Sequence, residues 1–260
     1  MSERPLILVS NDDGVNAAGV RALAKALRSV ADVVVVAPKH EQSAQSHAIS
    51  LHRPLRHEVV ADQVHSIDGT PVDCVYVALY RDGLLPRRPD LCASGINLGP
   101  NLGSDVVYSG TVAAAREAAL RGIPSIAFSQ VGPATDAALE RAAATAANLC
   151  QRMLKATHPN SQVPLLNVNF PPDDPHGIRA TTLGIRHYAE GVDVRLDPRG
   201  RDYYWIGGPG GVRHEPAEGS DTDAIDDGFI SVTPLRIERT LREHLDFAAL
   251  VAGQPKPEPS

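Results

Sequence analysis

The sequence predicts an α/β protein with a mostly parallel central sheet. Residues 6–9 are apolar throughout, as in a strand buried on both faces, and a helical pattern and a second β-branched run follow within the first 40 residues. Strand, helix and strand in this order form a βαβ unit, which is normally right-handed. Further apolar runs at 89–95, 123–128 and 165–170 read as additional core strands. The length of 260 residues fits one large domain or a domain with an appended subdomain.

Two helices of the first half carry clear sequence signals. Five apolar residues recur at helical spacing and predict a helix over 17–30: Val20, Leu23, Ala24, Leu27 and Val30. A second helix is expected to begin at Thr70. Thr70 provides a cap, Pro71 suits the first helical position, and Asp73 completes a capping box.

The remaining segments of the first 156 residues are assigned by pattern. Residues 48–67 alternate apolar and polar side chains without helical spacing, so we expect a β-rich excursion with hairpins. An Ala-rich segment predicts a helix over 109–122, and a long apolar stripe predicts another over 136–156.

The chain changes character after residue 172. We predict a catalytic core over 1–172 and a C-terminal extension over 173–252, which is rich in Gly, Pro, Asp and Arg. The extension is expected to include a last strand at 229–233 and a last helix at 241–251. The Pro-rich residues 253–260 predict a disordered tail.

Composition narrows the possible partners and location. The formal charge of −6 gives no basic surface for a nucleic-acid polymer, and no apolar run has the length of a membrane span. We therefore expect neither partner. Three cysteines without metal-ligand spacing are typical of core residues in a reducing compartment: Cys74, Cys92 and Cys150. Only four residues separate Met1 from the first strand, so we expect no signal peptide and a cytoplasmic location.

Two adjacent carboxylates, Asp12 and Asp13, directly follow the first strand. In open α/β sheets, ligands bind where the carboxyl ends of strands meet the helices that follow. Neighbouring carboxylates repel each other unless a cation or a proton intervenes. The pair therefore indicates a metal site, and a solvated Asp-Asp-Gly turn remains the alternative at this point.

Loops after two other core strands leave the same edge of the sheet. They carry Ser43 in one loop, and Asn97 with Asn101 in the other. Together with Asp12 and Asp13 they offer carboxylate, hydroxyl and amide oxygens. An all-oxygen set favours Mg²⁺, Mn²⁺ or Ca²⁺ over zinc.

The helix predicted at 109–122 begins with Ser-Gly-Thr. Such a start offers backbone N–H groups, the positive end of a helix dipole and two hydroxyls, which favours an anion site. An ordinary N-cap serine gives the same pattern. A hard cation beside a helix N-terminus suits hydrolysis of a phosphate ester, because the cation neutralises phosphoryl oxygens and activates a water.

Short motifs follow one another in a fixed order along nearly the whole chain. They are Ser10–Val15, Ala37-Pro38 with Ser43, Gly69–Cys74, Ser94–Asn97, Gly99–Gly103, Tyr108–Thr111, Asn167–Pro171, Asp197–Gly200, Tyr204–Gly207, Thr222-Asp223 and Ser231–Leu235. In their number and order these motifs resemble the SurE family, the survival protein E 5′/3′-nucleotidases.

The resemblance implies a Rossmann-like, three-layer core and a divalent-metal-dependent phosphomonoesterase. Its substrates would be nucleoside monophosphates, cleaved to nucleoside and phosphate by a metal-activated water. The family's metal ligands correspond here to Asp12, Asp13, Ser43 and Asn97, and the two aspartates are the expected catalytic residues. Mn²⁺ or Mg²⁺ is the implied ion, one per subunit, and Ca²⁺ is a further ion that could bind.

Two more expectations accompany this resemblance. The phosphate group of the substrate is expected to contact a second set of residues: Asn11, Asn101, Ser109, Gly110 and Thr111. The family pattern also implies a C-terminal hairpin and helix that exchange between the subunits of a homodimer or homotetramer.

One position departs from the family pattern. Gly usually follows the metal-binding Ser, but Ala44 stands here. If the position requires a positive φ, Ala costs about 1 kcal/mol.

Two alternatives to a SurE-type nucleotidase are weighed against these residues. A haloacid-dehalogenase-like phosphatase needs a nucleophilic Asp with a second Asp two residues later, and the pair Asn11 and Asp13 does not fit that requirement. The other alternative is a sensor or scaffold that binds nucleotides without hydrolysing them.

Overall fold

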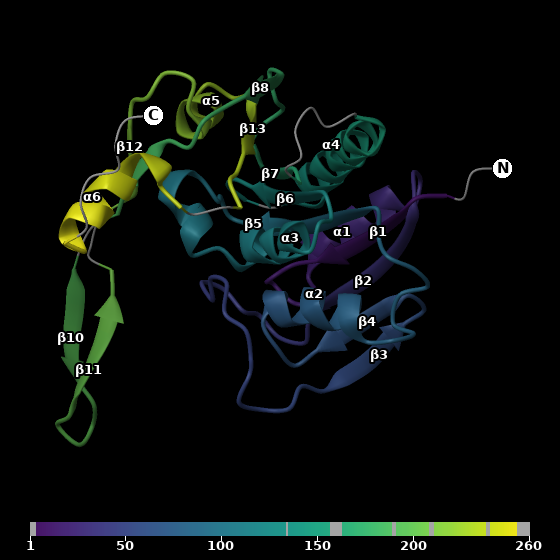
Figure 1. Ribbon diagram of the computed structural model, residues 1–260, viewed down its shortest axis with the longest axis horizontal. Helices are drawn as coiled ribbons and strands as arrows, with labels where there is room; N and C mark the ends of the chain where they lie inside the picture. The colour runs from purple at the N-terminus through teal and green to yellow at the C-terminus, as the bar shows by residue number, and fades with distance from the viewer. Residues whose placement is uncertain are drawn as a thin grey trace.

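The chain folds around one large sheet whose middle is parallel (Figure 1). The computed structural model describes residues 4–133, 135–156, 163–188, 191–207, 211–237 and 240–253. Among these residues the sheet has nine strands in the order β3-β4-β2-β1-β5-β6-β7-β13-β8. Their bounds are β1 Leu6–Ser10, β2 Asp32–Pro38, β3 His57–Ala61, β4 Val64–Ile67, β5 Leu91–Leu98, β6 Ser125–Gln130, β7 Leu165–Phe170, β8 Ile178–Ala180 and β13 Ile230–Pro234.

The strands from β4 to β7 run parallel, which places their carboxyl ends at one edge. β3 pairs antiparallel with β4 at one side, and β13 pairs antiparallel with β7 at the other. β8 then pairs parallel with β13. Two strands from the predicted extension, β8 and β13, thus belong to the same sheet as the core strands.

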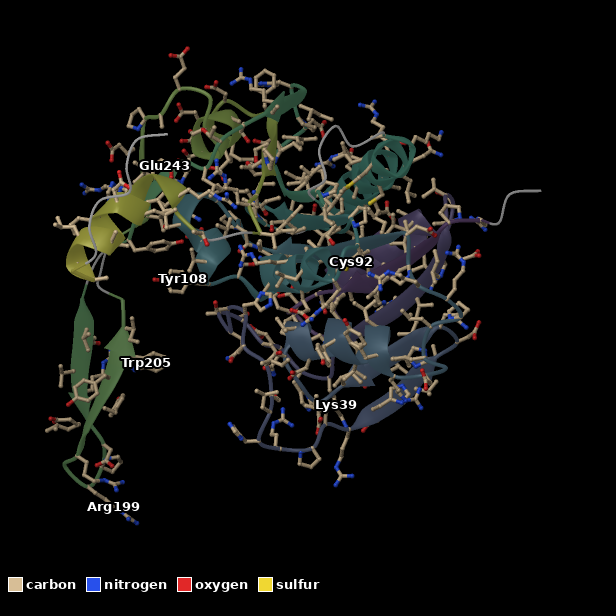
Figure 2. All side chains as sticks on the ribbon, in the orientation of Figure 1. Lys39, Cys92, Tyr108, Arg199, Trp205 and Glu243 are labelled. Carbon is tan, nitrogen blue, oxygen red and sulfur yellow. The ribbon has the colours of Figure 1, made fainter. Side chains whose placement is uncertain are left out.

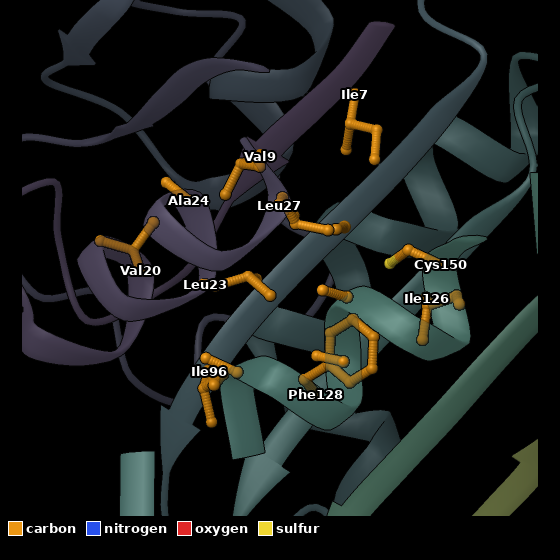
Figure 3. Packing of buried hydrophobic residues seen from close by; sticks show 14 of the residues in the cluster. Ile7, Val9, Val20, Leu23, Ala24, Leu27, Ile96, Ile126, Phe128 and Cys150 are labelled. Carbon is orange, nitrogen blue, oxygen red and sulfur yellow. The ribbon is translucent and has the colours of Figure 1, made fainter. Parts of the chain in front are cut away.

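Four helices cover the two faces of the sheet and create three layers (Figure 1). On one face lie α1 (Ala18–Leu27) and α4 (Asp136–Lys155), and on the other lie α2 (Pro71–Tyr80) and α3 (Gly110–Leu120). Figure 3 shows Leu23 and Leu27 of α1 packed against Phe128 of β6 and Cys150 of α4. Burial of each such large apolar side chain stabilises the fold by about 1.5–3 kcal/mol.

The described residues between 185 and 215 form an arm that extends from the core (Figure 1). β9 (Ile185–His187) pairs antiparallel with β12 (Arg213–Glu215), and between them β10 (Val192–Leu196) and β11 (Asp202–Ile206) form a hairpin. Short helices complete the fold: η1 (Gly103–Val107), α5 (Asp221–Asp226), η2 (Arg242–His244) and α6 (Leu245–Val251). No helix among the described residues combines the length and apolar character that crossing a membrane requires.

Most predicted elements are confirmed with small shifts at their ends. The helix expected over 17–30 is α1, and the one expected at Thr70 is α2. The α2 capping box is complete, since Asp73 N donates to Thr70 Oγ1 at 3.1 Å and Thr70 N donates to Asp73 Oδ2 at 2.9 Å. The predicted last helix is split into η2 and α6.

Two local predictions are wrong. Residues 48–56 form no strand, because side chains at the start of α2 hold this segment in an irregular conformation: Ser50 N donates to Asp73 Oδ1, and Thr70 Oγ1 donates to Ala48 O. Only the second half of the expected β-rich excursion forms a hairpin, β3 with β4. The strand predicted at 89–95 continues as β5 to Leu98, so Asn97 lies on a strand and not in the loop. Of the predicted tail, residues 254–260 lie outside the described residues.

Candidate metal and phosphate site

The two aspartates lie at the carboxyl edge of the sheet, where three loops meet. Asp12 is 4% exposed and Asp13 is half-buried. The loop after β2 is attached to the first strand's turn, since Gln42 N donates to Asp12 O at 2.7 Å. The end of β5 is attached to the same turn, since Leu98 N donates to Asp13 Oδ2 at 3.3 Å. The structure therefore brings together the loops that the sequence places at one edge.

The N-terminus of α3 faces the Asp12 carboxylate. The Thr111 hydroxyl donates to Asp12 Oδ1, and the backbone N–H groups of Gly110 and Thr111 also hydrogen-bond this carboxylate. Gly110 permits the approach, because a Cβ atom there would lie 2.8 Å from Asp12 Cβ. Ser109 caps the helix by accepting from Val112 N at 3.1 Å. The positive end of a helix dipole thus meets a negative charge.

Burial raises the pKa of both carboxylates, and for Asp13 the charge of Asp12 adds to this rise. Desolvation raises the pKa of Asp12, although the hydrogen bonds from Thr111 and Gly110 oppose it. Desolvation, followed by the charge of Asp12, raises the pKa of Asp13 to about 6, and the Leu98 N–H opposes that rise. The two ionised carboxylates are therefore stabilised only in part by the protein itself.

The oxygen atoms at this edge fit a hard divalent cation. No ion pair between described residues involves Asp12 or Asp13. Asn11 Oδ1 is buried next to them and has no hydrogen-bond partner, while its Nδ2 donates to Gly14 O at 3.0 Å. The described residues contain no cluster of three His, Cys, Asp or Glu side chains suited to a metal. A cation here would need hydroxyl, amide or water oxygens as well, which suits Mg²⁺ or Mn²⁺.

The other two expected metal ligands make hydrogen bonds within their own segments of the chain. Ser43 is exposed, and its hydroxyl donates to Glu41 Oε1 at 2.8 Å. Asn97 uses its Nδ2 to donate to Gly99 O at 2.8 Å. None of the hydrogen bonds between described residues joins either side chain to Asp12 or Asp13.

Asn101 belongs to a buried polar network at the ends of β6 and β7. Its backbone N–H donates to Asn169 Oδ1 and its Nδ2 donates to Ser129 Oγ, both at 2.8 Å. Asn167 Nδ2 donates to Asn101 O at 2.7 Å. Sequence reasoning gave Ser129, Asn167 and Asn169 no role. Polar residues interspersed with apolar ones in β6 and β7 were the signal that could have identified them.

The family model described as Survival protein SurE matches residues 7–190, which is well over half of the chain. The chain belongs to the SurE family.

Bacterial members of the SurE family align with nearly the whole chain. A protein from Sorangium cellulosum named 5′-nucleotidase SurE is 51% identical over 254 residues, covering 96% of this chain and 97% of its own. A protein of the same name from Vibrio vulnificus is 46% identical and covers 93% of this chain and 94% of its own. The crystal structure of the SurE protein from Aquifex aeolicus matches with a TM-score of 0.81 at 36% identity, over 95% of this chain and 100% of that one.

Ala44 has the backbone conformation that favours the glycine of the SurE pattern. Its φ is +57°, in the left-handed region that L-residues other than Gly adopt at a cost. Position 44 therefore has the positive φ at which Ala, in place of Gly, costs about 1 kcal/mol. The loop retains the strained conformation with Ala in place of Gly.

Proposed function

We propose that this member of the SurE family, a 5′-nucleotidase like its named relatives, hydrolyses nucleoside monophosphates to nucleoside and phosphate with the help of one divalent cation, Mn²⁺ or Mg²⁺. The observation that carries this proposal is the Asp12–Asp13 carboxylate pair beside the N-terminus of α3, which forms no ion pair with any described residue. An anionic phosphate and a cation complement each other at such a site.

Four residues would hold the cation. Asp12 and Asp13 supply the charge, Ser43 supplies a neutral oxygen from the loop after β2, and Asn97 supplies one from the end of β5. A bound divalent cation supplies charge neutralisation for the phosphoryl oxygens and lowers the pKa of a coordinated water. Thr111 and Gly110 keep the Asp12 carboxylate in place through the hydrogen bonds of α3.

The start of α3 and the turns beside it would bind the phosphate. Ser109, Gly110 and Thr111 form the start of α3, where the positive end of the helix dipole favours an anion. Asn11 keeps an unpartnered amide oxygen at the carboxylate pair. Asn101, through its contacts with β6 and β7, would fix the loop that leads into the helix. Because phosphoryl transfer depends mainly on positioning and charge neutralisation, these groups suffice without a covalent nucleophile.

We place the enzyme in the cytoplasm as a homodimer or homotetramer. Its three cysteines are buried and free, as is typical of a reducing compartment. Exposed apolar residues on the arm and on α6 would be covered by a second subunit, and they include Tyr204, Ile206, Phe247 and Leu250.

The proposal is tested with nucleoside 5′- and 3′-monophosphates after chelation of metals. We expect phosphate release to stop with the chelator and to return with Mn²⁺ or Mg²⁺. Asp13→Asn should then lower the rate at least a hundredfold at saturating substrate without changing the circular dichroism spectrum. Nucleotide binding with no phosphate release under any metal would instead favour a sensor that binds without turnover.

A further inference from the structure

Side chains of the C-terminal half of the chain contact residues 103–109, the turn that precedes α3. η1 has no side-chain cap of its own, and it leads directly into the first turn of α3. Ser109 N donates to Asp105 O at 3.0 Å, and Tyr108 N donates to the same oxygen at 2.9 Å. Ser46 holds the same turn from the core side, since its N–H donates to Tyr108 O at 2.9 Å and its hydroxyl donates to Val107 O at 2.7 Å. Asp105 and Ser46 together therefore fix the turn that leads into α3.

Both carboxylate oxygens of Asp105 are occupied by side chains at the root of the arm. The Tyr188 hydroxyl donates to Oδ1 at 2.5 Å, and Arg186 pairs with Oδ2. The Arg186 and Asp105 side chains are only 8% and 11% exposed, so water screens this pair weakly. Burial and the neighbouring Asp105 carboxylate raise the pKa of Tyr188 to about 12, so its hydroxyl remains a donor well above neutral pH.

A third side chain fixes the other end of the turn. Asp221 is fully buried and accepts from Gly103 N at 3.0 Å and from Gly184 N at 2.7 Å. The contact is close, because a Cβ atom on Gly103 would lie 2.5 Å from Gly184 O. One carboxylate thus joins the start of η1 to the chain segment just before β9.

We propose that Arg186, Tyr188 and Asp221 form a clamp that positions the 103–109 turn for phosphate binding. This inference rests on the proposed function, since it takes the start of α3 to be the phosphate site. Arg186 also neutralises the Asp105 carboxylate, which would otherwise repel an anion at Ser109. Because β9 pairs with β12 at the base of the β10–β11 hairpin, the clamp links the arm to the phosphate site (Figure 1).

The clamp is tested by calorimetric titration of inorganic phosphate into the full-length protein with Mg²⁺ present. Tyr188→Phe removes one hydrogen bond to a charged group and should raise the dissociation constant about tenfold. Arg186→Met should raise it further, and Arg186→Lys, which keeps the charge, should restore part of the affinity. Tyr80→Phe is the matched control. Tyr80 is exposed, its hydroxyl bonds to none of the described residues, and the variant should bind phosphate as the wild type does.

A double-mutant cycle separates positioning from a general loss of stability. If the clamp acts through the first turn of α3, Tyr188→Phe and Ser109→Ala should together weaken phosphate binding by less than the product of their separate factors. Tyr80→Phe and Ser109→Ala should combine independently. Wild-type affinity in Tyr188→Phe, or independent factors for Tyr188 and Ser109, would overturn the clamp, as would a wild-type protein that binds no phosphate.

The proposed function is tested in a separate assay, which measures the adenosine formed from adenosine 5′-monophosphate. A wild-type protein that binds phosphate but forms no adenosine contradicts the nucleotidase proposal and leaves the binding result for the clamp intact. Should Arg186→Met fail to fold, the more conservative Tyr188→Phe decides the question.

Discussion

Asp13 carries a stability cost that the cation would remove. Its pKa is raised from 3.8 to about 6 by desolvation and by Asp12, so the folded state binds a proton more tightly than the unfolded state. The cost is absent below pH 3.8, where the carboxyl is protonated in both states. It grows as the pH rises toward 6 and is complete above that value.

Asp13→Asn should therefore stabilise the chelated protein above pH 6. One pKa unit corresponds to about 1.4 kcal/mol, and solvent screening of this half-buried group reduces the expected gain to about 1 kcal/mol. Urea unfolding in a chelator at pH 7.5 and at pH 4 measures the difference, which should shrink at the lower pH. An equal gain at both pH values would show that the carboxylate charge is not its cause.

Ala44→Gly should stabilise the loop that carries Ser43. The left-handed conformation of Ala44 costs about 1 kcal/mol, and Gly adopts it freely. After the greater freedom of Gly in the unfolded chain is counted, we expect a gain of about 0.5 kcal/mol in the free energy of unfolding. Ala48→Gly is the control in the same loop. Ala48 is not among the residues with positive φ, so this change should destabilise the protein.

The contact between α3 and Asp12 leaves no room for a side chain at position 110. Gly110→Ala would place a Cβ atom 2.8 Å from Asp12 Cβ and 3.0 Å from its Oδ2, so the carboxylate must shift. We expect Mn²⁺ affinity to fall at least tenfold, because metal sites tolerate displacements of only about 0.5 Å. Titration with Mn²⁺, followed by electron paramagnetic resonance of the free ion, measures this. Gly211→Ala, where the added Cβ meets nothing within 4 Å, should bind Mn²⁺ like the wild type.

The elements differ in how far the sequence could predict them. Elements with local causes were predicted well: the Thr70 capping box and the apolar stripe of α1 depend on residues within a few positions of one another. The 48–56 segment could not be predicted, because its conformation depends on side chains about 22 residues away on α2. The clamp was likewise beyond prediction, since Asp221 and Gly103 are 118 residues apart. At the candidate site, the sequence placed the carboxylate pair and the start of α3 near each other, as the structure does, and it missed the polar residues of β6 and β7.

The C-terminal part of the chain has two different roles. β13 lies inside the main sheet between β7 and β8, so removal of the chain from residue 220 onward would expose an inner strand. Such a truncation should give insoluble chains, and it does not test subunit exchange alone. A sharper test changes only the hairpin.

The β10–β11 hairpin presents one apolar face to solvent. The pairing of Val192 with Ile206 and of Val194 with Tyr204 places these four side chains on one face, and all four are more than half exposed. Figure 2 shows this hairpin projecting away from the core, with Arg199 at its tip and Trp205 near its middle. An isolated two-stranded hairpin is only marginally stable in water, so a surface from a second subunit would stabilise it.

Val194→Asp should shift the proposed oligomer toward monomers. The charge would have to be buried without a partner if the apolar face lies in a subunit interface, which costs several kcal/mol. Light scattering during size-exclusion chromatography measures the mass at several protein concentrations. Asp193→Ser, on the opposite face of the same strand, is the control and should keep the wild-type mass. If the clamp connects the arm to the first turn of α3, the monomeric variant should also bind phosphate more weakly. An unchanged mass for Val194→Asp would mean that the apolar face of the hairpin is not the surface that joins the subunits.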